Sequence, residues 1–133
     1  MAPTFFSTLE ARWASGARLC IGLDAKADLM PPHVFSVFER PKEAFNRDII
    51  FATADLALCY KLNPAFLNER ELRGTMSFIR NIAPDVPVII DEKRGDVWTS
   101  SERYAKEVFD DFGADAVTIN PYFGQDALEP FLA

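Results

Sequence analysis

Histidine and cysteine, two residue types that often carry chemistry, are scarce in this sequence of 133 residues. The one histidine, His33, follows Pro31 and Pro32, a context typical of a surface residue without a chemical role. The two cysteines, Cys20 and Cys59, both lie inside apolar runs. We therefore expect buried, reduced thiols, as in a cytosolic protein, rather than a disulfide.

The sequence also lacks an excess of basic residues, a long apolar run and a leader-like amino terminus. Its net charge of −6 disfavours a nucleic-acid binder, which would need a basic face. No apolar run approaches the ~20 residues of a membrane span. The amino terminus lacks the basic segment followed by an apolar one that is typical of a signal peptide, so we expect no signal peptide. The composition, 49% hydrophobic and 26% charged, predicts one ordinary globular domain, which we expect in the cytoplasm.

Short apolar runs alternate with helical patterns along the chain. We expect strands over residues 19–24, 58–63, 86–92 and 116–120. Amphipathic helices are expected to start at Pro41, at Asn68 or Glu69, and after a cap at Thr99 or Ser100. Strands that alternate with helices predict an α/β fold with a parallel sheet and right-handed crossovers.

Polar side chains follow the predicted strands at their carboxyl ends. Strand side chains alternate, so Asp91 and Lys93 point to one side and Glu92 to the other, before Gly95 releases the backbone into a turn. Adjacent parallel strands lie about 4.8 Å apart, so their ends should gather these side chains at one rim. The residues at this rim are Asp24, Lys61, Asp91, Lys93 and Asn120. Because buried charges are costly unless they are paired, this convergence predicts a functional site.

Four segments, in this order, resemble the orotidine 5′-phosphate decarboxylase family. They are Gly22-Leu23-Asp24, Lys61-Leu62-Asn63-Pro64, Asp91-x-Lys93-Arg94-Gly95-Asp96 and Asn120-Pro121-Tyr122-Phe123-Gly124. The resemblance implies a TIM (β/α)8 barrel that needs no cofactor and no metal, and of which this sequence holds the first four strands. It also implies the conversion of orotidine 5′-monophosphate to UMP and CO₂ in pyrimidine biosynthesis.

The resemblance assigns catalytic roles to four residues: Lys61, Asp91, Lys93 and Asp96. In the family the last aspartate serves the neighbouring subunit's site, which implies a homodimer with shared active sites. Loss of CO₂ leaves a carbanion at C6 of the pyrimidine, with no π-system to spread the charge. Lys93 is the expected stabiliser of that charge and the expected proton donor, and Asp91 is expected beside the departing carboxylate.

A second group of residues is expected to bind the substrate. The resemblance implies that Asp24 and Lys61 hydrogen-bond the ribose hydroxyls. Asn120 and Ser100 complete the candidate substrate-binding set.

Two residues depart from the family's pattern. Glu92 faces the predicted helix layer, where a small or apolar residue is usual, and an ion pair with Arg80 or Arg94 or partial solvation would accommodate it. Trp98 follows Asp96 where we expect a smaller residue, in a position to alter the dimer contact.

The family's phosphate site comes from the loops after the seventh and eighth strands, which would lie beyond Ala133. We therefore expect residues 1–133 to form a single truncated barrel domain with weak activity alone. One alternative is a sugar-phosphate decarboxylase or aldolase of the same superfamily, which binds Mg²⁺ and carries an acidic residue in place of Lys61. Another is a non-catalytic half barrel that pairs with a partner chain.

Overall fold

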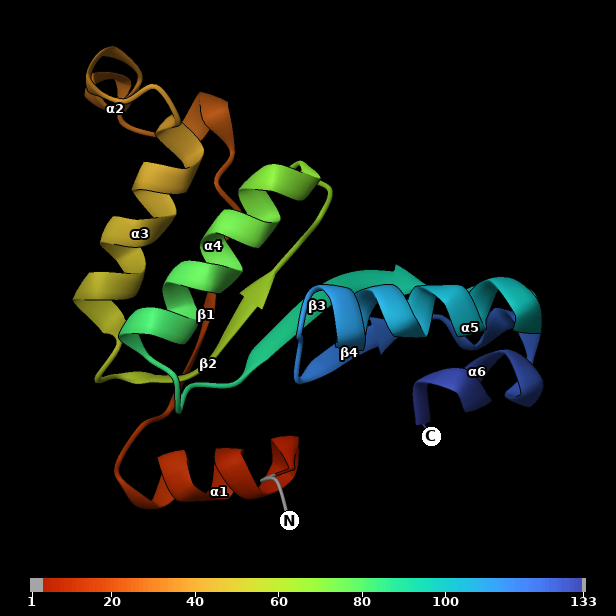
Figure 1. The fold of residues 1–133 in the computed structure, drawn as a ribbon. Coiled ribbons are helices and arrows are strands. Elements are labelled where there is room, and N and C mark those ends of the chain that lie inside the picture. Colours follow the sequence, from red (N-terminus) through yellow and green to blue (C-terminus); the bar gives the residue numbers. More distant parts are fainter. Residues whose placement is uncertain (1–3, 133) are drawn as a thin grey trace.

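The computed structural model describes residues 4–132 and contains four parallel strands in one sheet (Figure 1). Their order in the sheet is also their order in the chain: β1 (Leu19–Gly22), β2 (Ala57–Leu62), β3 (Val88–Arg94) and β4 (Ala116–Ile119). Parallel neighbours need a long crossover between them, which helices supply here. The predicted α/β fold with parallel β/α repeats is confirmed.

Helices connect successive strands, and other helices precede β1 and follow β4. The longer ones are α1 (Phe5–Ala14), α3 (Pro41–Thr53), α4 (Glu69–Ile82), α5 (Trp98–Lys106) and α6 (Gln125–Leu132). The shorter ones are η1 (Ala27–Leu29), α2 (Pro32–Val37), the π-helical turn η2 (Glu107–Asp111) and η3 (Pro121–Phe123). Helix α4 begins at Glu69, one of the two predicted starts. Asn68 caps it, since its side chain accepts from the Glu71 N–H while the Glu71 carboxylate accepts from the Asn68 N–H. Within residues 4–132, no helix has both the length and the apolar character to cross a bilayer.

The third strand lies further along the chain than predicted. The expected span of 86–92 is replaced by Val88–Arg94, because Pro87 has no N–H and contributes only its carbonyl, which accepts from the Tyr60 N–H at 3.0 Å. At the other end, the Asn120 N–H donates to the Arg94 carbonyl at 2.7 Å and extends the pairing with β4. Both members of the Asp-x-Lys pair are therefore part of β3.

Helix α5 does not begin with the predicted hydroxyl cap. It starts at Trp98, and its N-cap residue Val97 has no side chain that can accept a hydrogen bond. The Val97 carbonyl instead accepts from the N–H groups of Ser100 and Ser101, each at 3.0 Å. The predicted cap at Thr99 or Ser100 is wrong, because the chain turns into the helix directly after Asp96.

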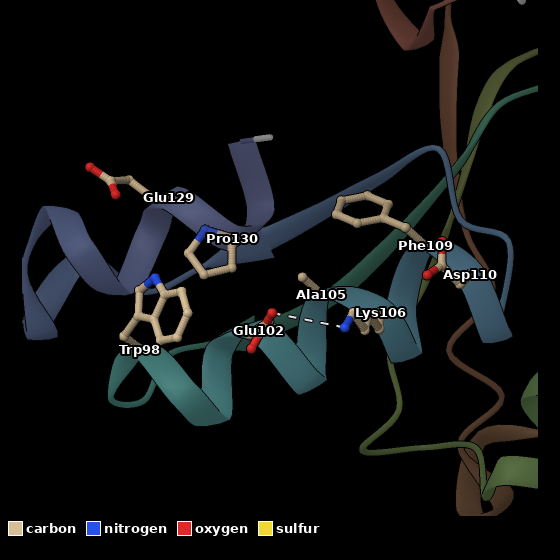
Figure 2. Close-up of a pocket in the computed structure, with 8 residues that line it drawn as sticks. All are labelled: Trp98, Glu102, Ala105, Lys106, Phe109, Asp110, Glu129 and Pro130. Carbon is tan, nitrogen blue, oxygen red and sulfur yellow. Dashed lines mark ion pairs between the residues drawn. The ribbon is translucent and has the colours of Figure 1, made fainter.

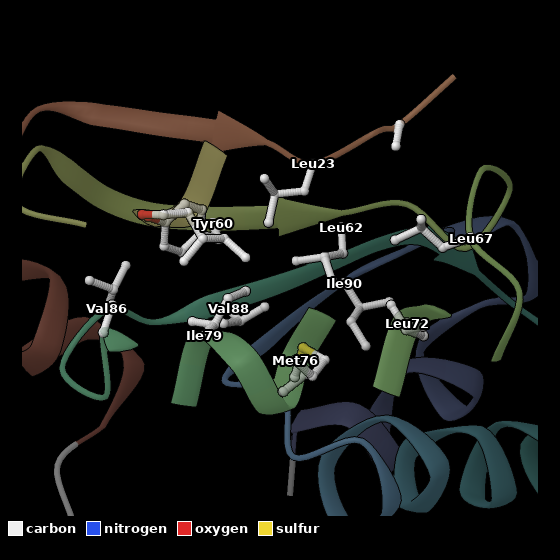
Figure 3. Packing of buried hydrophobic residues seen from close by; sticks show 14 of the residues in the cluster. Leu23, Tyr60, Leu62, Leu67, Leu72, Met76, Ile79, Val86, Val88 and Ile90 are labelled. Carbon is white, nitrogen blue, oxygen red and sulfur yellow. The ribbon is translucent and has the colours of Figure 1, made fainter. Parts of the chain in front are cut away.

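The hydrophobic core lies between the sheet and the helices, chiefly α4 (Figure 3). Buried side chains alternate with less buried ones along the strands, so one face of β2 and β3 meets the apolar stripe of α4. The central members are Tyr60, Leu62, Val88 and Ile90 from the strands and Leu72, Met76 and Ile79 from α4. Each such side chain contributes about 1.5–3 kcal/mol when it is fully buried. Lys61 lies between Tyr60 and Leu62 and is turned to the opposite face.

The two cysteines differ in exposure. Both thiols are free, and Cys59 is buried as predicted. Cys20 is exposed, so the prediction of a buried thiol is wrong for this residue. Its strand, β1, pairs on one side only within the described chain, with β2, and is therefore an edge strand.

Candidate active site

Lys61 is the point where two aspartates from neighbouring strands converge. Its Nζ lies 3.0 Å from Asp91 Oδ2 and 3.3 Å from Asp24 Oδ2. Lys61 is the fifth residue of β2 and its backbone pairs with Gly22 on one side and Ile89 on the other. Asp24 lies two residues beyond Gly22, and Asp91 two residues beyond Ile89, so strand alternation directs all three side chains to one face.

Asp91 binds a second lysine with its other carboxylate oxygen. Lys93 Nζ lies 2.6 Å from Asp91 Oδ1, and the Thr118 hydroxyl donates to the same oxygen at 2.9 Å. The side chain of Asp91 is only 14% exposed, whereas that of Lys93 is 67% exposed. The carboxylate is thus fixed from three sides, while the Lys93 ammonium is accessible to a ligand on the open face of the sheet.

These contacts change the acid–base properties of the cluster. The hydrogen bond from Lys93, followed by those from Lys61 and Thr118, holds the pKa of Asp91 well below its ordinary value. Burial alone would lower the pKa of Lys61, but the hydrogen bonds to Asp91 and Asp24 outweigh that effect and raise it. Asp91 is therefore an anion and Lys61 a cation at neutral pH.

The backbone around Lys93 is unusual. Lys93 has φ of 51°, the only positive φ of a non-glycine residue among residues 4–132. Gly95 was expected to supply the conformational freedom here, but its φ is not in the left-handed region. A Cβ at Gly95 would lie 2.8 Å from the carbonyl oxygen of Asn120, so the glycine is needed for a close approach of two backbones. Lys93 adopts the left-handed conformation instead. This conformation costs free energy in a non-glycine residue and is typical of functional sites.

Three of the predicted site residues lie outside this group of contacts. The Asp96 carboxylate accepts from the N–H of Val97 at 2.7 Å, and the side-chain oxygen of Asn120 accepts from the Tyr122 N–H at 3.1 Å. Ser100 lies in the first turn of α5 and is partly buried. The structure therefore joins Asp24, Lys61, Asp91 and Lys93, which we call the charged cluster, and leaves Asp96, Asn120 and Ser100 beside it.

The sequence analysis did not identify Thr118 as a residue of this site. It is the polar residue inside the apolar strand Ala116-Val117-Thr118-Ile119, a signal that could have drawn attention to it. A threonine suits a β-strand in any case, so its presence alone does not predict a contact with the charged cluster.

Glu92 points away from the charged cluster. It pairs with Arg94, with 2.5 Å between Glu92 Oε2 and Arg94 Nη2, which selects one of the two expected partners. Arg94 also lies 3.3 Å from Glu107 and over the ring of Tyr104. This second set of charges connects β3 to the helix layer, on the face of the strand opposite the charged cluster.

A well-defined groove lies elsewhere, between α5 and α6 (Figure 2). It has a volume of about 540 Å³ and is lined by Trp98, Glu102, Ala105, Lys106, Phe109, Asp110, Glu129 and Pro130. Glu102 and Lys106 pair along α5 at 3.8 Å, and no member of the charged cluster lines the groove. The candidate site therefore lies at the rim of the sheet, separate from this groove.

Comparison with known proteins agrees with the resemblance in the sequence. The family model described as orotidine 5′-phosphate decarboxylase / HUMPS family matches residues 17–133. The orotidine 5′-phosphate decarboxylase of Cellvibrio japonicus is 40% identical over 137 residues, which cover 98% of this chain and 50% of the relative. That of Parabacteroides distasonis is 44% identical over 120 residues, which cover 86% of this chain and 42% of the relative.

Solved structures give the same result. The structure of the OMP decarboxylase of Leishmania donovani superposes with a TM-score of 0.78 at 31% identity, covering 97% of this chain and 49% of that one. The chain thus spans about half the length of the relatives that it matches. With the family model covering all but its first residues, the chain belongs to the orotidine 5′-phosphate decarboxylase / HUMPS family.

Proposed function

We propose that this chain carries the catalytic charges of an orotidine 5′-monophosphate decarboxylase, a lyase that produces UMP and CO₂ in pyrimidine biosynthesis. The observation that carries the proposal is the charged cluster, in which Asp91 lies between the ammonium groups of Lys61 and Lys93 at 3.0 and 2.6 Å. Two cations and two carboxylates at the carboxyl end of parallel strands provide a fixed electrostatic field where a barrel enzyme holds its substrate.

Lys93 is the proposed proton donor. In the reaction the bond from C6 to the carboxylate carbon breaks, the electron pair stays on C6, and CO₂ leaves. The Lys93 ammonium stabilises the charge on C6 and then gives it a proton, and solvent returns a proton to the lysine. The exposure of the Lys93 side chain leaves room for a pyrimidine ring at its ammonium.

Asp91 and Lys61 prepare Lys93 for this step. The Asp91 carboxylate pairs with the Lys93 ammonium at 2.6 Å and so positions it, and Lys61 balances the negative charge of the two aspartates. We place the carboxylate of the substrate next to Asp91, so that its departure relieves a repulsion between two anions. Asp24 and Lys61 bind the ribose hydroxyls in this arrangement, with Asn120 further along the rim.

We also propose a cytoplasmic homodimer in which Asp96 serves the site of the neighbouring subunit, while Ser100 stays a proposed substrate-binding residue. In its favour, the Asp96 carboxylate contacts the N–H of Val97 and not the lysines of its own chain. Mixing a Lys93→Ala with an Asp96→Ala variant would test sharing, because a mixed dimer would regain one intact site. Activity of the mixture no higher than that of the two variants measured separately would contradict it.

The metal-dependent alternative, a sugar-phosphate decarboxylase or aldolase, fits the geometry less well. The Lys61 ammonium occupies the space between Asp24 and Asp91 where a divalent cation would need to bind. We expect a chelator to leave decarboxylation unchanged. Loss of activity on chelation, with recovery on addition of Mg²⁺, would favour the alternative.

The direct test of the proposal is a titration with UMP. The chain is titrated alone and after mixing with the carboxyl-terminal half of the Cellvibrio japonicus relative, and NMR shifts are followed at the lysine side chains. We expect UMP to shift the signals of Lys61 and Lys93, with a higher UMP affinity after mixing. These shifts should disappear in the Asp91→Ala variant and stay in the control Asp85→Ala, which removes an exposed carboxylate. A mixture that assembles by size-exclusion chromatography yet shows no response to UMP would favour a non-catalytic half barrel.

A further inference from the structure

Strand β4 has one residue where β3 has three. The pairing runs in register through Ile90 and Val117 and resumes at Arg94 and Ile119. Asp91, Glu92 and Lys93 thus form a bulge in β3, and Thr118 is the one residue of β4 opposite it. A bulge of this kind redirects side chains and leaves backbone groups without their ladder partners.

The Thr118 hydroxyl makes the contacts that the interrupted ladder cannot make. Its oxygen accepts from the Lys93 backbone N–H at 3.0 Å, and its proton is donated to Asp91 Oδ1 at 2.9 Å. A hydroxyl group donates and accepts at once, which is what these two neighbours require. The same N–H belongs to the residue whose φ is 51°, so this hydrogen bond supports a strained backbone.

We propose that Thr118 is the positioning residue of the decarboxylation site, one that fixes the Asp91 carboxylate and the Lys93 backbone relative to each other. The inference rests on the proposed function for its catalytic consequence. Thr118 acts through its neighbours: it sets the place of the carboxylate that binds the Lys93 ammonium at 2.6 Å, and it holds the left-handed turn from which that ammonium projects. Displacement of either group would move the proton donor away from C6.

A pair of substitutions separates the hydroxyl from the shape of the side chain. Thr118→Val keeps the volume and the β-branch but has no hydroxyl, whereas Thr118→Ser keeps the hydroxyl. Thr8→Val is the matched control, since the Thr8 hydroxyl donates to the carbonyl of the N-cap residue Thr4 at 3.0 Å, at the start of α1 and away from the carboxyl ends of the strands (Figure 1).

The test that does not depend on activity is NMR of the 133-residue chain. In Thr118→Val we expect the Lys93 amide to exchange with solvent about tenfold faster, as for the loss of one hydrogen bond, and the titration midpoint of the Asp91 carboxyl carbon to rise. Thr118→Ser and Thr8→Val should match the wild type in both measurements. Unchanged exchange and an unchanged Asp91 midpoint in Thr118→Val would overturn the proposal.

The catalytic consequence is measured in the mixture with the carboxyl-terminal half of the relative. Thr118→Val should lower kcat much more than it changes KM, and Thr118→Ser should restore kcat. Equal kcat values in all three proteins would overturn the positioning role. Failure of the proposed function gives a different result, because the wild-type mixture would then not bind UMP even where the NMR effects of Thr118→Val are present.

Discussion

Among single residues, Asp91 is the one on which most of the charged cluster depends. It accepts from Lys61, Lys93 and Thr118, so its removal leaves two ammonium groups facing each other without an anion between them. Like charges at close range repel, and the polar partners of a partly buried group lose their hydrogen bonds. The residue therefore affects folding as well as the proposed chemistry.

We predict that Asp91→Asn lowers the free energy of unfolding by about 1–3 kcal/mol, since the amide keeps the shape but not the charge. Urea denaturation followed by circular dichroism measures this change. Asp85→Asn removes an exposed partner of Arg12 and should cost less than about 1 kcal/mol. An Asp91→Asn variant as stable as the wild type would show that the lysines do not need this carboxylate.

The lowered pKa of Asp91 predicts an acid dependence of stability. Because the pKa in the folded state lies below that of the unfolded chain, the charged form contributes stability above the ordinary pKa near 3.9, and that contribution is lost as the pH falls through this range toward the folded-state pKa. The wild type should therefore lose more stability than Asp91→Asn between about pH 5 and pH 3. If the urea midpoints of the two proteins fell by the same amount over this range, the lowered pKa of Asp91 would be contradicted.

The sequence was most informative about residues whose position follows from strand alternation. Asp24, Lys61, Asp91 and Lys93 were expected at one rim, and the structure brings them into contact. Thr118 was not expected, because its contact depends on a bulge that changes the register between β3 and β4. No local pattern in the sequence indicates where a partner strand skips residues.

At the scale of elements, the turn after β3 packs unusually close to the segment that follows β4. The backbone of Gly95 approaches that of Asn120, which follows β4, so tightly that a Cβ would lie 2.8 Å from the Asn120 carbonyl oxygen. This contact keeps the turn after Lys93 against the sheet. The geometry of the charged cluster thus depends on two segments that are distant in sequence.

We predict that Gly95→Ala destabilises the chain by about 1–3 kcal/mol, the usual cost of inserting a methyl group where there is no room. Gly22→Ala is the control, because its Cβ would meet only the Asp24 side chain at an ordinary 3.5 Å. Thermal denaturation of both variants measures the difference. Equal melting temperatures would mean that the Asn120 segment moves freely away from Gly95.

Element types were predicted correctly, whereas several element ends were not. Alternation of apolar strands with amphipathic helices identified the β/α repeats, and Asn68 marked the start of α4. The start of α5 was misplaced because the Val97 carbonyl, and not a hydroxyl side chain, accepts from the N–H groups of Ser100 and Ser101. Such caps carry no residue signature, so they are visible only in the folded chain.

At the scale of the whole molecule, the parallel sheet has two edge strands, β1 and β4, within the described chain. Unpaired edges of a parallel sheet call for a covering partner, and the relatives that the chain matches are about twice its length. We therefore expect the charged cluster to be well formed in this chain but poorly able to hold a substrate phosphate without the other half of a barrel.

The measurement that tests the account most directly is the rate of orotidine 5′-monophosphate decarboxylation by this chain mixed with the carboxyl-terminal half of the Cellvibrio japonicus relative. We predict turnover well above that of either half alone, lost at least about thousandfold in Lys93→Ala and retained in Lys106→Ala, which removes an exposed lysine of α5. Turnover that persists in Lys93→Ala would contradict the claim that the Lys93 ammonium delivers the proton to C6.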